Sequence, residues 1–197
     1  MKRFLITICA IFLITMPSAI AQFYDLTGQM MAGAYLSYAF GMGDIFKDYE
    51  DQYFKVTSSA GIGFGGTFYY GLKEKIMLGG ELMFQHYGGS VESKTTSPFG
   101  AYTGSGGASS TKLSILANGL YAMSYDDESA FFLSGGAGLY DYGGMKLGLN
   151  AGVLYRKMVS DKVYIYGSPR FHIVFGDVTF ELLQLAVGVQ FSLGNKM

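Results

Sequence analysis

Apolar residues alternate with small or polar residues in eight segments of the chain, and a period of two is typical of β-strands. In the last segment, Leu185, Val187 and Val189 fall on one face, whereas Gln184 and Gln190 fall on the other. A tilted strand needs about 9 to 11 residues to cross a bilayer, and every segment reaches about that length. The pattern predicts an all-β protein with strands at Met31–Gly41, Ser59–Gly71, Ile76–Tyr87, Thr111–Tyr125, Ala130–Tyr142, Met145–Arg156, Val163–Ile173 and Leu183–Leu193.

The composition favours a barrel in a membrane over a soluble protein. Apolar residues make up 50% of the chain and charged residues only 15%, whereas a soluble domain carries about 25% charged residues. The net charge of −1 argues against nucleic-acid binding, which calls for a basic surface. In a soluble sandwich or lipocalin-like barrel, polar residues such as Glu81 and Gln184 would face water together with many glycines. A soluble exported ligand-binding barrel nevertheless stays open as an alternative.

The N-terminus has the organisation of a secretory signal peptide. Lys2 and Arg3 precede the apolar run Phe4–Met16, and Ala19-Ile20-Ala21 supplies a cleavage pattern before Gln22. The apolar run is shorter than the roughly 20 residues of a membrane-spanning helix, which argues against a membrane anchor. We therefore predict a signal peptide at residues 1–21 and a barrel domain at residues 22–197.

The predicted connections alternate between short and long. The short, charged connections are Leu72–Lys75, Asp126–Ser129 and Val159–Asp161, and the long ones are Met42–Ser58 and Gly88–Ser110. Transmembrane barrels have short periplasmic turns and longer extracellular loops. The pattern is weaker at Gly143-Gly144 and Gly176–Glu181, where a long loop is expected and the connection is short or modest.

Aromatic residues on the apolar faces fall into two groups, as the aromatic girdles of a membrane barrel require. The group expected near the turn end is Tyr70, Tyr125, Phe131, Tyr155 and Phe191. The group expected near the loop end is Tyr38, Phe40, Phe84, Phe171 and Phe175.

With these features, the chain resembles the small outer-membrane β-barrels, the OmpA/OmpX-like group. The resemblance implies an eight-stranded antiparallel up-and-down transmembrane β-barrel in the outer membrane of a Gram-negative (diderm) bacterium, in contact with outer-membrane lipid. The segment Gly188–Leu193 is similar to the C-terminal signal that the barrel assembly machinery recognises. It departs from the usual form because Gly194–Met197 follow it, and the chain does not end on an aromatic residue.

The sequence contains motifs that resemble ligand-binding or catalytic sites, but the residues around them do not fit such a site. Gly61–Gly66 matches G-x-G-x-x-G, but a dinucleotide site needs these glycines between a strand and a helix, and here they lie inside a predicted strand. His86 and His172 lack metal-ligand spacing, and neither belongs to the His-x-Ser pair of outer-membrane lipid A deacylases. We therefore predict no catalytic, cofactor-binding or metal-binding residue.

Four charged residues fall on the predicted lumen face: Glu81, Lys146, Arg156 and Arg170. An eight-stranded barrel is only just wide enough for side chains to fill, so an ion-paired plug is favoured over a selective pore or proton path. Glu81 and Arg170 are both expected near mid-depth, and we predict that they pair. Arg156 is the second choice of partner for Glu81.

The two long loops are the predicted interaction sites. The first contributes acidic and aromatic residues, which are Asp48, Tyr49, Glu50, Asp51 and Tyr53, and the second contributes Phe99 and Tyr102. Loops on a rigid scaffold commonly carry binding residues. The predicted function is a non-enzymatic structural or surface-interaction role with an unknown extracellular partner. The alternatives are a narrow, porin-like pore, an outer-membrane lipid-modifying enzyme and the soluble exported barrel.

Overall fold

The computed structural model describes residues 25–42, 49–50, 54–97, 100–126, 128–176 and 179–193. These contain nine strands: β1 (Met30–Gly41), β2 (Tyr49–Glu50), β3 (Phe54–Lys73), β4 (Ile76–Ser97), β5 (Gly100–Tyr125), β6 (Ser129–Asp141), β7 (Met145–Ser160), β8 (Val163–Val174) and β9 (Phe180–Ser192). The predicted signal peptide at residues 1–21 lies outside the described residues.

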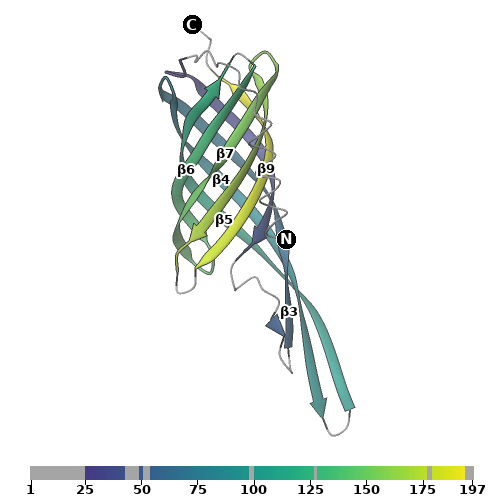
Figure 1. Ribbon diagram of the computed structural model, residues 1–197. Coiled ribbons are helices and arrows are strands. Elements are labelled where there is room, and N and C mark those ends of the chain that lie inside the picture. The colour runs from purple at the N-terminus through teal and green to yellow at the C-terminus, as the bar shows by residue number, and fades with distance from the viewer. Residues whose placement is uncertain are drawn as a thin grey trace.

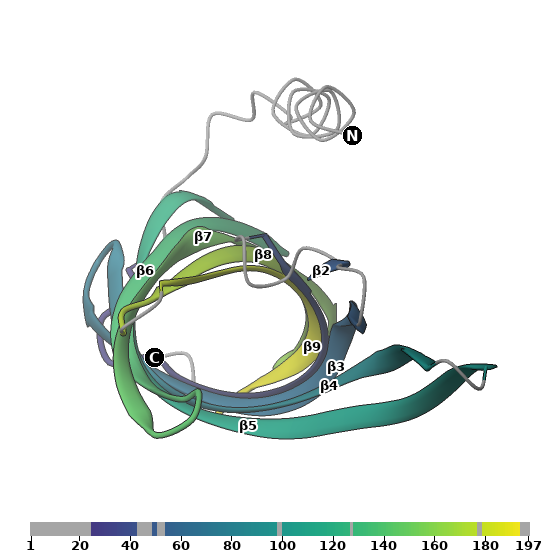
Figure 2. The same cartoon turned by 90° about the horizontal axis from the view of Figure 1, so that it is seen from below.

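Eight of the strands close into an antiparallel barrel (Figures 1 and 2). Neighbours follow the chain from β3 to β9, and β1 joins the two ends by pairing with both β3 and β9. The short β2 is an addition on the edge of β3. Closure removes the free edges of the barrel wall and leaves no long run of unpaired backbone within it. The predicted fold class, an eight-stranded up-and-down barrel, is confirmed.

The outer face of the wall is apolar, and the inner face carries the polar residues. Leu36, Val187 and Ile62 are 73%, 69% and 63% exposed, whereas Glu81 and Gln184 on the inner face are 3% and 1% exposed. A soluble ligand-binding barrel would place its apolar residues inside, so this orientation contradicts the soluble alternative. A continuous apolar outer surface is stable only against hydrocarbon, and the barrel is therefore a transmembrane barrel. No helix in the described part of the chain is long and apolar enough to span a membrane.

The predicted girdle aromatics point outward with one exception. Tyr70, Tyr155 and Phe191 near the turn end are 42–48% exposed. Tyr125, however, is only 6% exposed and lies inside the barrel. The pairing of β5 with β6 contains a register shift between Ala122 and Ser124, and the extra residue reverses the alternation that places Tyr125 outside.

The predicted loop Gly88–Ser110 is wrong, because this segment is mostly strand. β4 and β5 stay paired from Ile76↔Tyr121 out to Ser97↔Gly100, and β3 begins at Phe54, which shortens the first loop as well. The paired segments project beyond the barrel rim (Figures 1 and 2). A hydrophobic alternation reports the burial of one face, and a hairpin in water has no buried face, so the sequence lacks this signal.

The opposite end of the barrel is closed by tight turns and by the segment before β1. The backbone N–H groups of Leu26 and Gly28 donate to the carbonyls of Glu74 and Gly71, and the Leu26 side chain is fully buried. In the β5–β6 turn, Asp126 Oδ1 accepts the N–H groups of Glu128 and Ser129 at 2.9 and 2.6 Å. Partial burial raises the pKa of Asp126, but these hydrogen bonds outweigh it and hold the pKa below its ordinary value.

Candidate functional site

Glu81 on β4 and Arg170 on β8 form an ion pair inside the lumen. Arg170 Nη1 and Nη2 donate to Glu81 Oε2 and Oε1 at 2.5 and 2.6 Å, and the two residues are 5% and 3% exposed. The two-point geometry matches the planar guanidinium to the planar carboxylate. The structure thus contains the ion pair that we expect from the sequence.

Neutral polar side chains complete the shell around the Glu81 carboxylate. The Tyr35 hydroxyl donates to Oε1, and Asn118 Nδ2 donates to Oε2 at 2.9 Å. Asn118 is itself oriented by Asn150, whose Nδ2 donates to Asn118 Oδ1 at 2.9 Å. Each carboxylate oxygen therefore accepts two hydrogen bonds, and these compensate for the loss of water around a buried charge.

Glycines of β3 leave space for the neighbouring backbone and for inward side chains such as Tyr35. A Cβ atom at Gly65 would lie 2.4 Å from the Tyr35 hydroxyl, and one at Gly63 would lie 2.3 Å from the Phe84 carbonyl oxygen. Both glycines belong to the G-x-G-x-x-G match, which lies within β3 and not between a strand and a helix. The motif serves packing in the lumen.

His172 forms a second polar group with Tyr140 and Gln184. His172 Nδ1 lies 2.9 Å from the Tyr140 hydroxyl, and Nε2 lies 3.1 Å from Gln184 Oε1. Gln184 Nε2 in turn donates to Met83 Sδ at 3.0 Å. Both ring nitrogens are engaged by a phenol and an amide, so His172 has no hydroxyl nucleophile of the Ser type to activate. Among the described residues, no group of three or more His, Cys, Asp and Glu side chains is arranged to hold a metal ion.

Arg156 and Lys146 lie apart from the central pair. Arg156 is 1% exposed near the turn end, its guanidinium carbon lies 4.9–5.4 Å from three ring centroids, and its Nη2 donates to Gln29 Oε1 at 3.3 Å. The rings are those of Tyr125, Phe132 and Tyr164. Arg156 is therefore not the partner of Glu81. Lys146 lies near the loop end, where its Nζ is 5.5 Å from the centroid of the Phe180 ring.

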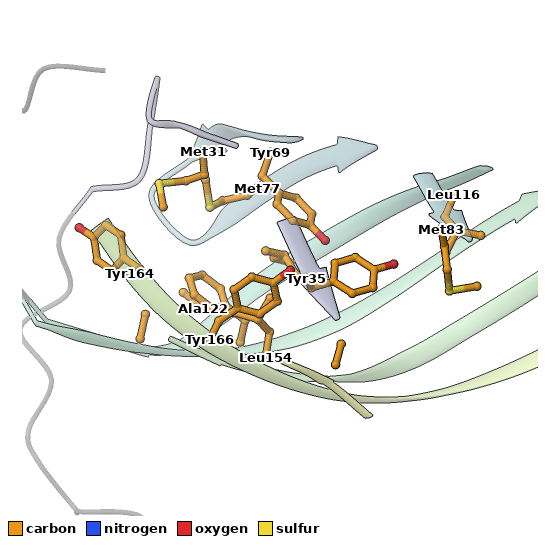
Figure 3. Close-up of a cluster of buried hydrophobic side chains, with 14 of the residues drawn as sticks. Met31, Tyr35, Tyr69, Met77, Met83, Leu116, Ala122, Leu154, Tyr164 and Tyr166 are labelled. Carbon is orange, nitrogen blue, oxygen red and sulfur yellow. The ribbon is translucent and has the colours of Figure 1, made fainter. Parts of the chain in front are cut away.

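Tyrosine, methionine and leucine side chains fill the lumen around these groups. Figure 3 shows part of this buried cluster, including Met31, Met77 and Tyr166. Tyr35, Asn118, Asn150 and Gln184 did not appear among the predicted site residues. Their only sequence signal is a polar or aromatic residue at an inward strand position.

The predicted loop residues are only partly described. Tyr49 and Glu50 form β2 and pair with Val56 and Lys55, and Tyr102 lies on β5 opposite Thr95. Asp48, Asp51, Tyr53 and Phe99 lie outside the described residues. Of the described candidates, Tyr49 and Glu50 therefore lie on a different strand from Tyr102.

No family model and no curated protein matches the chain. Among solved structures, the outer membrane protein OprG from Pseudomonas aeruginosa is similar, with 14% identity, a TM-score of 0.51, and coverage of 86% of this chain and 97% of that one. A de novo designed transmembrane β-barrel has 10% identity, a TM-score of 0.50, and coverage of 85% and 97%. Neisserial surface protein A has 13% identity, a TM-score of 0.48, and coverage of 83% and 97%. The chain has the fold of the small eight-stranded transmembrane β-barrels of outer membranes.

Proposed function

We propose that this protein is a non-enzymatic barrel of a Gram-negative outer membrane and that its projecting sheet meets an extracellular partner. The observation that carries the proposal is the free edge of β5. β5 pairs with β4 from Gly100 onward but with β6 only from Ser114 onward. From Gly100 to Leu113, one edge of β5 therefore has no neighbouring strand among the described residues.

A free edge of this kind offers unpaired backbone donors and acceptors to an extended segment of another protein. Charged residues and proline commonly protect an exposed edge, but the chain has neither between Gly100 and Thr111, and Lys112 at the barrel end is the one charged residue of the free segment. Strand addition is thus the form of binding that this sheet favours. This revises the loop hypothesis, because the partner meets the free edge of a hairpin and not only the tips of two loops.

The filled lumen argues against the pore alternative. Glu81, Asn118, Asn150 and Arg170 are 3–5% exposed and occupy the middle of the barrel, while Gln184 is 1% exposed. A channel of the porin type needs many more strands to leave a water-filled opening. The lipid-modifying alternative loses support because His172 contacts Tyr140 and Gln184 and not the hydroxyl of a serine.

Export and assembly are part of the same proposal. The signal peptide predicted at residues 1–21 would direct the chain to the Sec pathway. The segment Gly188–Leu193 would be recognised by the barrel assembly machinery, and most of it lies on β9, the strand that closes the barrel against β1. Outer-membrane lipid would then surround the apolar outer face.

The test compares surface attachment of bacteria that produce the native protein or a shortened hairpin. In the shortened variant, an Asn-Gly turn replaces residues 89–108, since Gly88 and Ser109 are paired and lie close enough to be joined. We expect normal insertion, seen as a heat-modifiable band in the outer-membrane fraction, together with loss of attachment to host-matrix or bacterial surfaces.

A second variant tests the edge itself. Gly104→Lys combined with Gly106→Lys keeps the hairpin but places charge beside the free edge, and it should reduce attachment as the deletion does. Attachment that survives both changes would contradict the proposed role. Ion conduction by the purified native barrel in planar bilayers would favour the pore instead.

A further inference from the structure

Two lysines lie at the extracellular mouth of the lumen, above the His172 group. Lys112 on β5 and Lys146 on β7 occupy inward positions and are half-buried. Lys112 Nζ is 5.6 Å from the centroid of the Tyr142 ring, and Lys146 Nζ is 5.5 Å from that of the Phe180 ring. Such cation–π contacts hold a flexible ammonium group in place without neutralising its charge.

The aromatic rings form one connected cluster between the lysines. The Tyr142 and Phe180 centroids are 5.1 Å apart, and the hydroxyls of Tyr87 and Tyr142 are 2.9 Å apart. The end of the Lys146 side chain lies against Gly176, because a Cβ atom at Gly176 would lie 2.6 Å from Lys146 Nζ. The mouth therefore presents two positive charges, from the two strands that flank β6, beside one aromatic cluster.

Neither lysine forms an ion pair with a carboxylate in the part of the chain that the structure describes. The nearby Asp141 accepts the N–H of Gly144. Glu181 lies on β9 opposite Ile173. Ile173 points outward because its neighbours His172 and Val174 point inward, and Glu181 therefore points outward as well. Two half-buried positive charges without a carboxylate partner favour the binding of an anion.

We propose that this mouth binds a phosphate or sulfate group of a soluble polyanionic ligand between Lys112 and Lys146. Both anions present several oxygens around one centre, so two ammonium point charges can share them. The lysines face the lumen, whereas lipid headgroups surround the outside of the wall, which favours a soluble ligand over a membrane lipid. Lys112 lies at the barrel end of the free β5 segment, but its side chain faces the lumen and strand addition does not use it, so the proposal does not depend on strand addition.

The test is titration calorimetry of the refolded protein in zwitterionic micelles with inositol hexakisphosphate as the probe. We expect binding that weakens with added salt. Lys112→Gln and Lys146→Gln should each lower the affinity about fivefold, the upper end of the range for exposed ion pairs, while Lys112→Arg should retain it. Lys73→Gln, which removes the same charge from an exposed residue at the turn end, is the matched control and should bind as the native protein does.

Inorganic phosphate and vesicles containing an anionic lipid serve as further probes. Weak binding of inorganic phosphate that the two mouth substitutions also reduce would support the site. Absence of polyanion binding, equal loss in Lys73→Gln, or affinity for the vesicles alone would overturn it. A heat-modifiable band for each variant shows that a lost affinity does not come from a lost fold.

Discussion

Glu81 and Arg170 join opposite walls of the barrel. Their strands, β4 and β8, are separated by three strands in the sheet order, so the ion pair crosses the lumen and does not follow the wall. Its hydrogen bonds of 2.5 and 2.6 Å connect residues 89 positions apart in the chain. The pair can form only when the barrel is closed, and it therefore stabilises only the closed barrel.

Glu81→Leu is expected to lower the free energy of unfolding by about 3–5 kcal/mol, because it leaves the Arg170 guanidinium buried without its partner. Adding Arg170→Leu should restore part of that loss, since no buried charge is then left alone. Urea titration followed by circular dichroism in micelles measures both. Strictly additive losses in the double variant would show that the two residues are not coupled.

Gly63→Ala should destabilise the barrel by roughly 1–3 kcal/mol, because the new methyl group meets the Phe84 carbonyl oxygen, which cannot move freely. Gly66→Ala on the same strand points outward and meets nothing closer than 3.7 Å. It should change the free energy of unfolding by less than about 0.5 kcal/mol. The same urea titration measures the free energy of unfolding of both variants. Equal losses at the two positions would mean that the assignment of inward and outward residues on β3 is wrong.

Val187→Arg should cost about 2–4 kcal/mol, since Val187 is 69% exposed at a position expected near the bilayer middle. Val159→Arg, at a residue 55% exposed next to the β7–β8 turn, should cost only about 0–1 kcal/mol because the charge reaches the interface. Refolding yield into lipid vesicles and urea unfolding measure the difference. A soluble protein would tolerate both substitutions alike.

Asp126→Ala should destabilise the β5–β6 turn at pH 7 but much less at pH 3. The folded-state pKa of Asp126 lies below its unfolded value, so its stabilising contribution is present above the unfolded pKa, about 4, and is lost as the pH falls through the folded pKa. Asp126→Asn keeps an acceptor without the charge and should show no such pH dependence. Unfolding midpoints at the two pH values test this, and a constant difference between native protein and Asp126→Ala would argue against it.

The barrel was predictable because one side of each strand must meet lipid. This requirement produces the alternation of apolar with small or polar residues around positions such as Val187. Features that depend on local irregularity were not. A single bulge near Ala122 turns Tyr125 inward, and the hairpin beyond Gly88 has no apolar face to mark it. The Glu81–Arg170 pair followed from depth and charge alone.

The residues around the Glu81–Arg170 pair could be identified only once the pairing register of the strands was known. Tyr35 reaches Glu81 because Gly65 leaves space across the strands, and this spacing appears only once β1 and β3 are paired. Arg156 illustrates the same limit, since its charge suggested a carboxylate partner while the fold surrounds it with aromatic rings. Cation–π contacts leave no charge pattern in a sequence.

The central claim is a barrel in the outer membrane with its β4–β5 hairpin outside the cell, and cysteine labelling on intact bacteria tests it most directly. The only native cysteine, Cys9, lies in the predicted signal peptide. Gly106→Cys has open space around the new side chain on the projecting hairpin, and Lys73→Cys occupies an exposed position at the opposite end. We predict that a membrane-impermeant maleimide labels the cysteine at position 106 on intact cells and the one at position 73 only after lysis. The reverse pattern, or equal labelling of both on intact cells, would contradict the account.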